Sequence, residues 1–276
     1  MLNQFKSIAF FFGENEQGSY IAEHAVALAQ RHDAHLIGIA YLEPLLDRYV
    51  GFARGEAAMR QTMNYLRSEY EKKVLEASQH IEELASKHGV SIEFRVIWSD
   101  TDAQGIANHL LHCDLVMIGF ETAPFSPERL LLTGGAPVLV VPQAWQGKSI
   151  GRRIILAWNA SRQARRALAE AMPFIASAEQ VKVLVVNAEK HPERYGEDPG
   201  ADITAYLARH EAPVTLERMS SNGTAVPDTI RSYAVANGAD LLVIGAYSRA
   251  RIGELLLGGV TRNWLSKPSI PLLLAQ

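Results

Sequence analysis

The feature that most constrains this chain is a short apolar pattern that occurs twice. Asp114 to Gly119 has the sequence Asp-Leu-Val-Met-Ile-Gly, and Asp240 to Gly245 has the sequence Asp-Leu-Leu-Val-Ile-Gly. A continuous apolar run ended by glycine is typical of a strand covered on both faces, as in a parallel sheet. The chain has 276 residues, about twice the usual domain size. We therefore expect two copies of one α/β unit.

Strand and helix patterns alternate in both copies. The predicted strands are 7–12, 36–41, 90–98, 114–119 and 137–142, followed by 153–158, 181–187, 214–219, 241–245 and 270–274. The predicted helices are 19–31, 56–87, one through 106–111 and 127–133, followed by 161–175, 202–210 and 225–237. This order implies right-handed βαβ units. The predicted fold is α/β, with two tandem doubly wound five-stranded parallel sheets in domains 1–145 and 151–276.

Composition excludes several classes of protein. Hydrophobic residues make up 48% and charged residues 21%, which is the mix of a folded chain. A formal net charge of -3 lacks the basic excess of a nucleic-acid-binding domain. The single cysteine, Cys113, cannot form an internal disulfide. No apolar run is long enough for a membrane span, and the N-terminus lacks a signal-peptide pattern. We expect a cytoplasmic protein with no nucleic-acid or membrane partner.

The candidate site lies where the first and fourth strands of the second half end, because ligands of such sheets bind beyond the carboxyl ends of the strands. Gly245 is followed by a loop and by Gly258-Gly259 at the start of a helix pattern. Backbone N–H groups at a helix N-terminus attract anions, and Thr261 adds a hydroxyl donor. Basic donors in or beside the loop are Arg249, Arg251 and Arg262. The alternative is that these glycines serve only the turn and the helix start.

The second half resembles a universal stress protein domain, and the whole chain resembles the tandem members of that family. The family signature is a glycine, two residues, a glycine, nine residues, and a glycine followed by serine or threonine. This chain keeps the spacing with Gly245, Ser248, Gly258 and Gly259. Ser248 replaces the second glycine and Gly259 replaces the hydroxyl residue. At the end of the first strand, Asn159 stands where ATP-binding members have an aspartate.

The resemblance implies a Rossmann-like fold of the adenine nucleotide alpha hydrolase type and a site for ATP or another adenine nucleotide, with Mg²⁺ possible beside it. The implied binding residues are Asn159, Val186, Gly245, Ser248, Gly258, Gly259, Val260 and Thr261. Val186 would lie near the adenine and the glycines near the phosphates. Asn159 lacks the aspartate charge, and its alternative role is in a turn, with Ser161 as the helix N-cap.

The first half lacks this loop. Gly119 to Pro137 spans 18 positions, whereas Gly245 to Pro271 spans 26, so eight residues are missing where the phosphate loop belongs. Gly134 and Gly135 therefore predict a helix C-cap. We expect nucleotide binding in the second half only.

Two further motifs carry little weight. His109, His112, Cys113 and Asp114 include zinc-ligand types, but Cys113 is expected to enter the buried strand, so no metal site is predicted. Gly147-Lys148-Ser149 resembles the end of a P-loop but precedes a strand and is interpreted as linker.

No catalytic constellation is visible, so at most weak ATPase activity is expected. The favoured function is a regulatory or adaptor protein of the stress response that binds an adenine nucleotide. The alternative is an interaction scaffold without nucleotide, working through unknown protein partners. The family resemblance implies an internal pseudo-dimer in which 137–142 faces 270–274, and a homodimer is possible. The helix 56–87 is a candidate dimer surface or lid.

Overall fold

The computed structural model describes residues 4–13, 20–42, 56–98, 103–246, 249–251, 254–256 and 259–276. The elements of the first half are β1 (Ser7–Phe12), α1 (Tyr20–His32), β2 (His35–Leu42), α3 (Glu56–Lys87), β3 (Ile92–Trp98), α4 (Ala103–Leu110), β4 (Leu115–Gly119), α5 (Pro127–Gly134) and β5 (Val138–Val141). A short 3₁₀ turn, Gln143–Trp145, begins the connection to the second half.

The second half repeats the order with an addition near its end. Its elements are β6 (Arg153–Ala157), α6 (Arg162–Ile175), β7 (Gln180–Val186), α7 (Pro192–Tyr195), α8 (Ala201–Arg209), β8 (Val214–Met219), α9 (Val226–Ala236), β9 (Leu241–Gly245), β10 (Arg249–Arg251), β11 (Glu254–Leu256), α10 (Gly259–Ser266) and β12 (Leu272–Ala275). A 3₁₀ turn, Ala188–Lys190, follows β7. The strands predicted from apolar runs are present, each within about two residues of the expected bounds.

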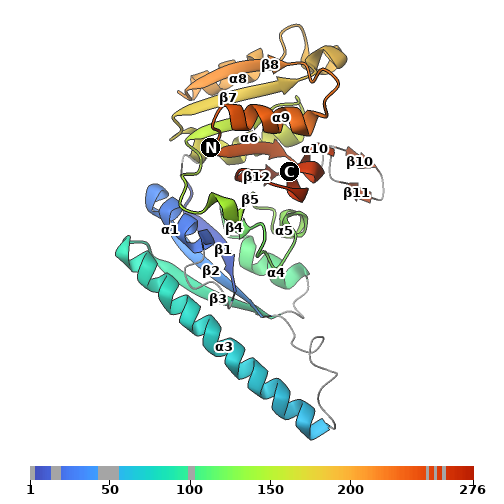
Figure 1. Ribbon diagram of the computed structural model, residues 1–276. Helices are drawn as coiled ribbons and strands as arrows, with labels where there is room; N and C mark the ends of the chain where they lie inside the picture. Colours follow the sequence, from blue (N-terminus) through green and yellow to red (C-terminus); the bar gives the residue numbers. More distant parts are fainter. Residues whose placement is uncertain are drawn as a thin grey trace.

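The ten long strands form one sheet with the order β3-β2-β1-β4-β5-β12-β9-β6-β7-β8. All neighbours are parallel except β5 and β12, which pair antiparallel with Leu139 opposite Leu273. The predicted facing of 137–142 and 270–274 is therefore observed as a hydrogen-bonded ladder. The two five-stranded parallel sheets are present, but the ladder makes them one continuous sheet (Figure 1).

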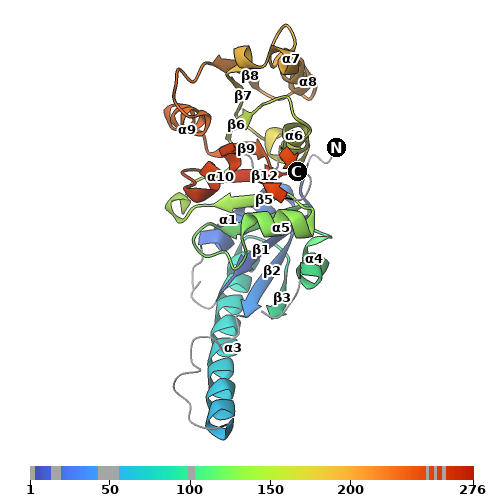
Figure 2. The same ribbon diagram turned by 90° about the vertical axis from the view of Figure 1, so that its right-hand side faces the viewer.

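Helices cover both faces of this sheet, as in other doubly wound folds (Figures 1 and 2). One core cluster packs α1, α3, α6 and α8 on one face, and it contains Ile21, Ile81, Leu168 and Leu207. The other cluster packs α4, α5, α9 and α10 on the opposite face. Because the first cluster includes residues from both halves, the halves share a core as well as a sheet.

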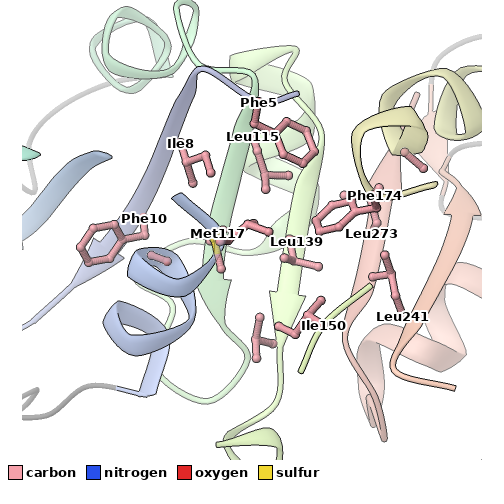
Figure 3. Packing of buried hydrophobic residues seen from close by; sticks show 14 of the residues in the cluster. Phe5, Ile8, Phe10, Leu115, Met117, Leu139, Ile150, Phe174, Leu241 and Leu273 are labelled. Atoms are coloured by element: carbon pink, nitrogen blue, oxygen red, sulfur yellow. The ribbon is translucent and has the colours of Figure 1, made fainter. Parts of the chain in front are cut away.

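The contact between the halves is apolar and closely packed. Phe174 of α6 lies beside Leu273 of the second half and near Leu139 of the first half (Figure 3). The ring of Phe5, before β1, meets the Phe174 ring edge-on at 5.0 Å between centroids. The N-terminal segment of one half is thus packed on the first helix of the other.

An aspartate next to the start of the fourth strand makes the same kind of hydrogen bond to the backbone in each half. Asp114 Oδ2 accepts hydrogen bonds from the backbone N–H groups of Lys6 (2.7 Å) and Ser7 (2.9 Å). Asp240 accepts from Arg152 (3.1 Å) and Arg153 (2.8 Å) before β6. Each carboxylate ties the start of the first strand to the start of the fourth. The sequence repeat therefore preserves a contact as well as an apolar pattern.

Helix α3 has the predicted bounds. Val74 and Ile81 on this helix are buried, while Leu75 is 61% exposed. The helix projects away from the sheet at its N-terminal end (Figure 2). Among the described residues, no helix combines the length and the apolar character that a membrane span requires.

Candidate functional site

A cavity of about 120 Å³ lies at the carboxyl ends of β6, β7 and β9, beside the start of α10. Strands β6 and β9 are neighbours although they are first and fourth in their half, so the strand order reverses at this point. Six of the eight residues implied by the resemblance line the cavity: Asn159, Val186, Gly245, Gly259, Val260 and Thr261. The other two, Ser248 and Gly258, lie outside the described residues.

Asn159 follows β6, and its side chain closes the turn into α6. Its Oδ1 accepts hydrogen bonds from the Ser161 hydroxyl (2.6 Å) and the Ser161 backbone N–H (3.3 Å). Ser161 Oγ in turn accepts from the N–H of Ala164 and caps α6, as predicted. Between them, Ala160 adopts φ 52°, a left-handed conformation that costs a non-glycine residue about 1 kcal/mol. The Asn159 oxygen therefore serves the turn, and its amide N–H₂ is the group that remains for a ligand.

Gly245 is required by packing between β9 and α6. A Cβ at this position would overlap the backbone of Gln163 and Ala164. The first turn of α6 thus rests directly on the end of β9. Thr261 of α10 is buried, and its hydroxyl donates to the Gly245 carbonyl over 3.4 Å. The expected phosphate donor at Thr261 is engaged in joining α10 to β9.

Gly259, in contrast to Gly245, is not closely packed. A Cβ placed there meets no heavy atom within 4 Å. Gly259 is exposed at the first position of α10, so the helix begins at the glycine pair, as predicted. The N–H groups of a first helical turn carry partial positive charge, and Gly259, Val260 and Thr261 of this turn line the cavity. Arg262 lies in the same turn with its side chain exposed, and the side chains of Arg249 and Arg251 lie outside the described part of the chain.

The remaining wall of the cavity is mostly apolar. Of the residues in this wall, only Val186 was predicted from the sequence. The others that line it are Ala157, Trp158, Leu184, Tyr195, Val226, Ile230 and Ile244. Tyr195 comes from the short helix α7, and burial raises the pKa of its hydroxyl, which keeps it neutral. The described lining residues carry no charge, so shape, hydrogen bonds and the α10 dipole are the means of recognition. No pattern in the sequence marks Tyr195, because its helix lies outside the strand-helix repeat.

The corresponding position in the first half, at the carboxyl end of β4, is occupied by side chains. A Cβ at Gly119 would overlap the side chains of Tyr20 and Thr122. Tyr20 is buried, and its hydroxyl lies 3.2 Å from the Val141 carbonyl and 3.3 Å from Glu121 Oε2. Gly135 has φ 67° and ends α5 as a C-cap, in agreement with the sequence prediction.

The histidine-cysteine segment has no metal-site geometry. Cys113 lies in the turn before β4, so its predicted place in the strand was wrong by two residues. Burial raises the pKa of its thiol to about 11, and its Sγ lies 3.6 Å from the His109 carbonyl oxygen. A protonated thiol is a poor metal ligand. In the described ranges, no three His, Cys, Asp or Glu side chains gather in a way that could hold a metal ion.

Comparison with known proteins agrees with the fold. Residues 151–276 match the sequence model of the universal stress protein family. The chain is 29% identical to the universal stress protein Slr1230 of Synechocystis over 175 residues, which are 58% of this chain and 57% of that protein.

Similar solved structures cover nearly the whole chain. A universal stress protein of Archaeoglobus fulgidus superposes with a TM-score of 0.69 at 12% identity, over 98% of each chain. A functionally unknown protein of Pseudomonas aeruginosa gives 0.60 at 18% identity, over 99% of this chain and 93% of that one. A universal stress protein in complex with cAMP aligns with 50% of this chain and 98% of its own, at 15% identity and a TM-score of 0.32. The similarity to the universal stress protein family is therefore carried by residues 151–276 in the sequence, and the similarity of fold extends over nearly the whole chain.

Proposed function

We propose that the second half, residues 151–276, binds an adenine nucleotide at the cavity between β6 and β9, and that the chain acts as a regulatory or adaptor protein in the stress response. The observation that supports this most is the convergence of Asn159, Val186 and Gly259 with Val260 on one cavity. These residues are far apart in the sequence, and the topology brings them to the point where such sheets bind ligands.

The described residues suggest how the nucleotide would be held. The adenine would occupy the apolar part beside Val186 and Ile230, with Tyr195 at its edge. The phosphates would lie at the N-terminus of α10, where Gly259 leaves open space. Mg²⁺, if present, would be bound mainly by phosphate oxygens and water, since the described lining residues include no carboxylate. First-half residues such as Tyr20 would serve as scaffold.

The small size of the cavity favours a second candidate function. Ligand pockets usually measure about 300–1,000 Å³, and this one measures about 120 Å³. A scaffold that has lost nucleotide binding and works through protein partners would keep the fold with a reduced cavity. The two functions differ in one measurable property, which is the affinity for ATP.

The first prediction uses Gly259→Ser, which restores the family's hydroxyl at a position with room for a Cβ. If the nucleotide proposal holds, ATP with Mg²⁺ binds the full chain, and Gly259→Ser binds it several-fold more tightly through the added donor. Isothermal titration calorimetry measures both affinities. The control is Gly135→Ala in the first half, which should cost about 1 kcal/mol of stability at its positive φ and leave the affinity unchanged.

Deleting residues 247–258 should abolish binding if the loop holds the phosphates. Absence of binding by the wild type at millimolar ATP would contradict the nucleotide proposal and support the scaffold. Equal loss of affinity from Gly135→Ala and from the loop deletion would contradict the assignment of binding to the second half alone.

A further inference from the structure

Residues 187–200 connect β7 to α8 and bring one side chain to the cavity at the strand ends. They contain the 3₁₀ turn after β7 and the four-residue helix α7, whose last residue, Tyr195, lines that cavity. In the sheet, β7 and β9 lie on opposite sides of β6, so α7 follows a strand on one side and α10 follows a strand on the other (Figure 2). Tyr195 and the N-terminus of α10 therefore border the cavity from different sides.

The connection begins with a fixed turn at Asn187. This residue is buried, and its backbone adopts a left-handed conformation with φ 56°. Its side chain forms two hydrogen bonds with Ser221, which follows β8. Asn187 Oδ1 accepts from the Ser221 N–H at 2.7 Å, and Asn187 Nδ2 donates to the Ser221 hydroxyl at 3.0 Å. The start of the connection is thus tied to the segment after β8.

The end of the connection is tied to β8 itself. Arg218 Nε donates to the Pro199 carbonyl at 2.7 Å, and the same guanidinium pairs with Asp198. Gly200 has φ 87°, and a Cβ at this position would overlap the side chain of Leu216. Because both ends of the connection are held, α7 has a defined position beside the cavity. A side chain that is positioned before the ligand arrives loses less freedom on binding.

Tyr195 is held by packing and not by a hydrogen bond of its hydroxyl. Its half-buried ring packs against the core cluster on the α6 face. Within the described ranges, the hydroxyl has no hydrogen-bond partner. The enclosed side-chain polar atoms that lack a partner in this part of the chain belong to His24, His32 and Trp264, so the Tyr195 hydroxyl keeps accessible surface. It is a free donor and acceptor.

This hydroxyl is the polar group on its side of the cavity. Trp158 and Asn159 follow β6, and Thr261 belongs to α10. In the described lining, the side chains that β7, α7 and α9 contribute are apolar except for Tyr195. A polar atom of a ligand that lies on this side, away from α10, therefore has the Tyr195 hydroxyl as its side-chain partner.

We propose that Tyr195 is a specificity-determining residue of this cavity and that its hydroxyl forms a hydrogen bond with the nucleoside part of the bound ligand. This inference rests on the nucleotide binding proposed above, with the phosphates at α10 and the adenine beside Val186. A base nitrogen or a ribose hydroxyl then lies on the side where Tyr195 stands. A site built to hydrogen-bond a ligand group discriminates against ligands that lack it.

The test compares the ATP affinities of the full wild-type chain, Tyr195→Phe and Tyr206→Phe by isothermal titration calorimetry in the presence of Mg²⁺. Tyr195→Phe keeps the ring and removes only the hydroxyl, and we expect it to weaken ATP binding by about three- to tenfold. Tyr206→Phe is the matched control, because Tyr206 is a half-buried tyrosine of the same half that does not line the cavity. Its loss should leave the affinity unchanged.

Inorganic tripolyphosphate, which lacks the nucleoside, separates the two parts of the ligand. The wild type and Tyr195→Phe should bind it equally, because its contacts would be at α10. A loss of tripolyphosphate affinity as large as the loss of ATP affinity would place the hydroxyl at the phosphates and overturn the proposal.

Arg218→Gln tests whether the anchored connection positions Tyr195. Arg218 does not line the cavity, and the substitution removes the guanidinium contacts with Asp198 and Pro199. We expect weaker ATP binding in the wild-type background and a smaller effect beside Tyr195→Phe, because the hydroxyl that the anchor positions is then absent. Equal effects in the two backgrounds would contradict this coupling.

The outcomes distinguish this inference from the proposed function. A wild type that binds no ATP at millimolar concentration contradicts the nucleotide proposal, and this inference with it. ATP binding that is equal in the wild type and Tyr195→Phe, or that is weakened equally by Tyr206→Phe, overturns the role of Tyr195 and leaves the nucleotide proposal standing.

Discussion

At the scale of single residues, His32 makes the stability of the protein depend on pH. Its ring is 2% exposed and packs edge-on against Phe5 at 5.0 Å between centroids and against Phe174 at 6.2 Å. Burial, together with the nearby charges of Arg31 and Lys6, lowers the pKa of His32 to about 4. The folded state therefore holds this ring neutral at neutral pH.

The sign of the effect follows from the two protonation states. The unfolded chain binds a proton near the ordinary histidine pKa of about 6.5, whereas the folded chain does so only near 4. The contribution of His32 to the free energy of unfolding should therefore be fully present above about pH 6.5. It should be lost as the pH falls to about 4, which lowers the free energy of unfolding by up to about 3 kcal/mol. Urea unfolding at a series of pH values measures this slope. His32→Leu should have a shallower slope, and equal slopes would contradict the assignment.

At the scale of elements, the contact of α6 with β9 depends on the absence of a side chain at Gly245. Gly245→Ala would place a Cβ against the backbone of Gln163 and Ala164, which cannot move without shifting the helix. We expect a loss of at least about 2 kcal/mol in the free energy of unfolding. Gly259→Ala is the matched control, because its Cβ meets open space. Thermal and urea unfolding compare the two variants, and similar losses from both would argue against this role of Gly245.

At the scale of the whole molecule, the β5–β12 ladder and the shared core join the halves into one unit. Leu273 is fully buried opposite Leu139, at the centre of this ladder. We expect the wild type to unfold in a single calorimetric transition. Leu273→Ala should cost about 2–5 kcal/mol and lower the temperature of that whole transition. Leu75→Ala, at an exposed leucine of α3, should change the transition little. Two separate transitions in the wild type would show that the halves unfold independently.

The strand-helix order, the repeat and the location of the candidate cavity could all be predicted from the sequence. An apolar run ended by glycine indicates a strand that is covered on both faces of the sheet. This pattern lies within a few consecutive residues, so it can be recognised without knowledge of the tertiary structure. Once the strand order of a doubly wound sheet is expected, the ends of the first and fourth strands meet by topology. This is why Asn159 and Gly245 were placed together correctly, although they are 86 positions apart in the sequence.

What only the tertiary structure decided depends on contacts between distant segments with no local pattern. Tyr20 fills the strand end of the first half by reaching Val141, 121 positions away, and no periodicity in α1 signals this. Gly245 satisfies the signature spacing, yet its surroundings show that α6 requires a glycine there. Local sequence determines which segments are buried, because burial follows from apolar character. The filling of each cavity depends on which side chains meet when distant segments pack, and that is set by the assembled fold.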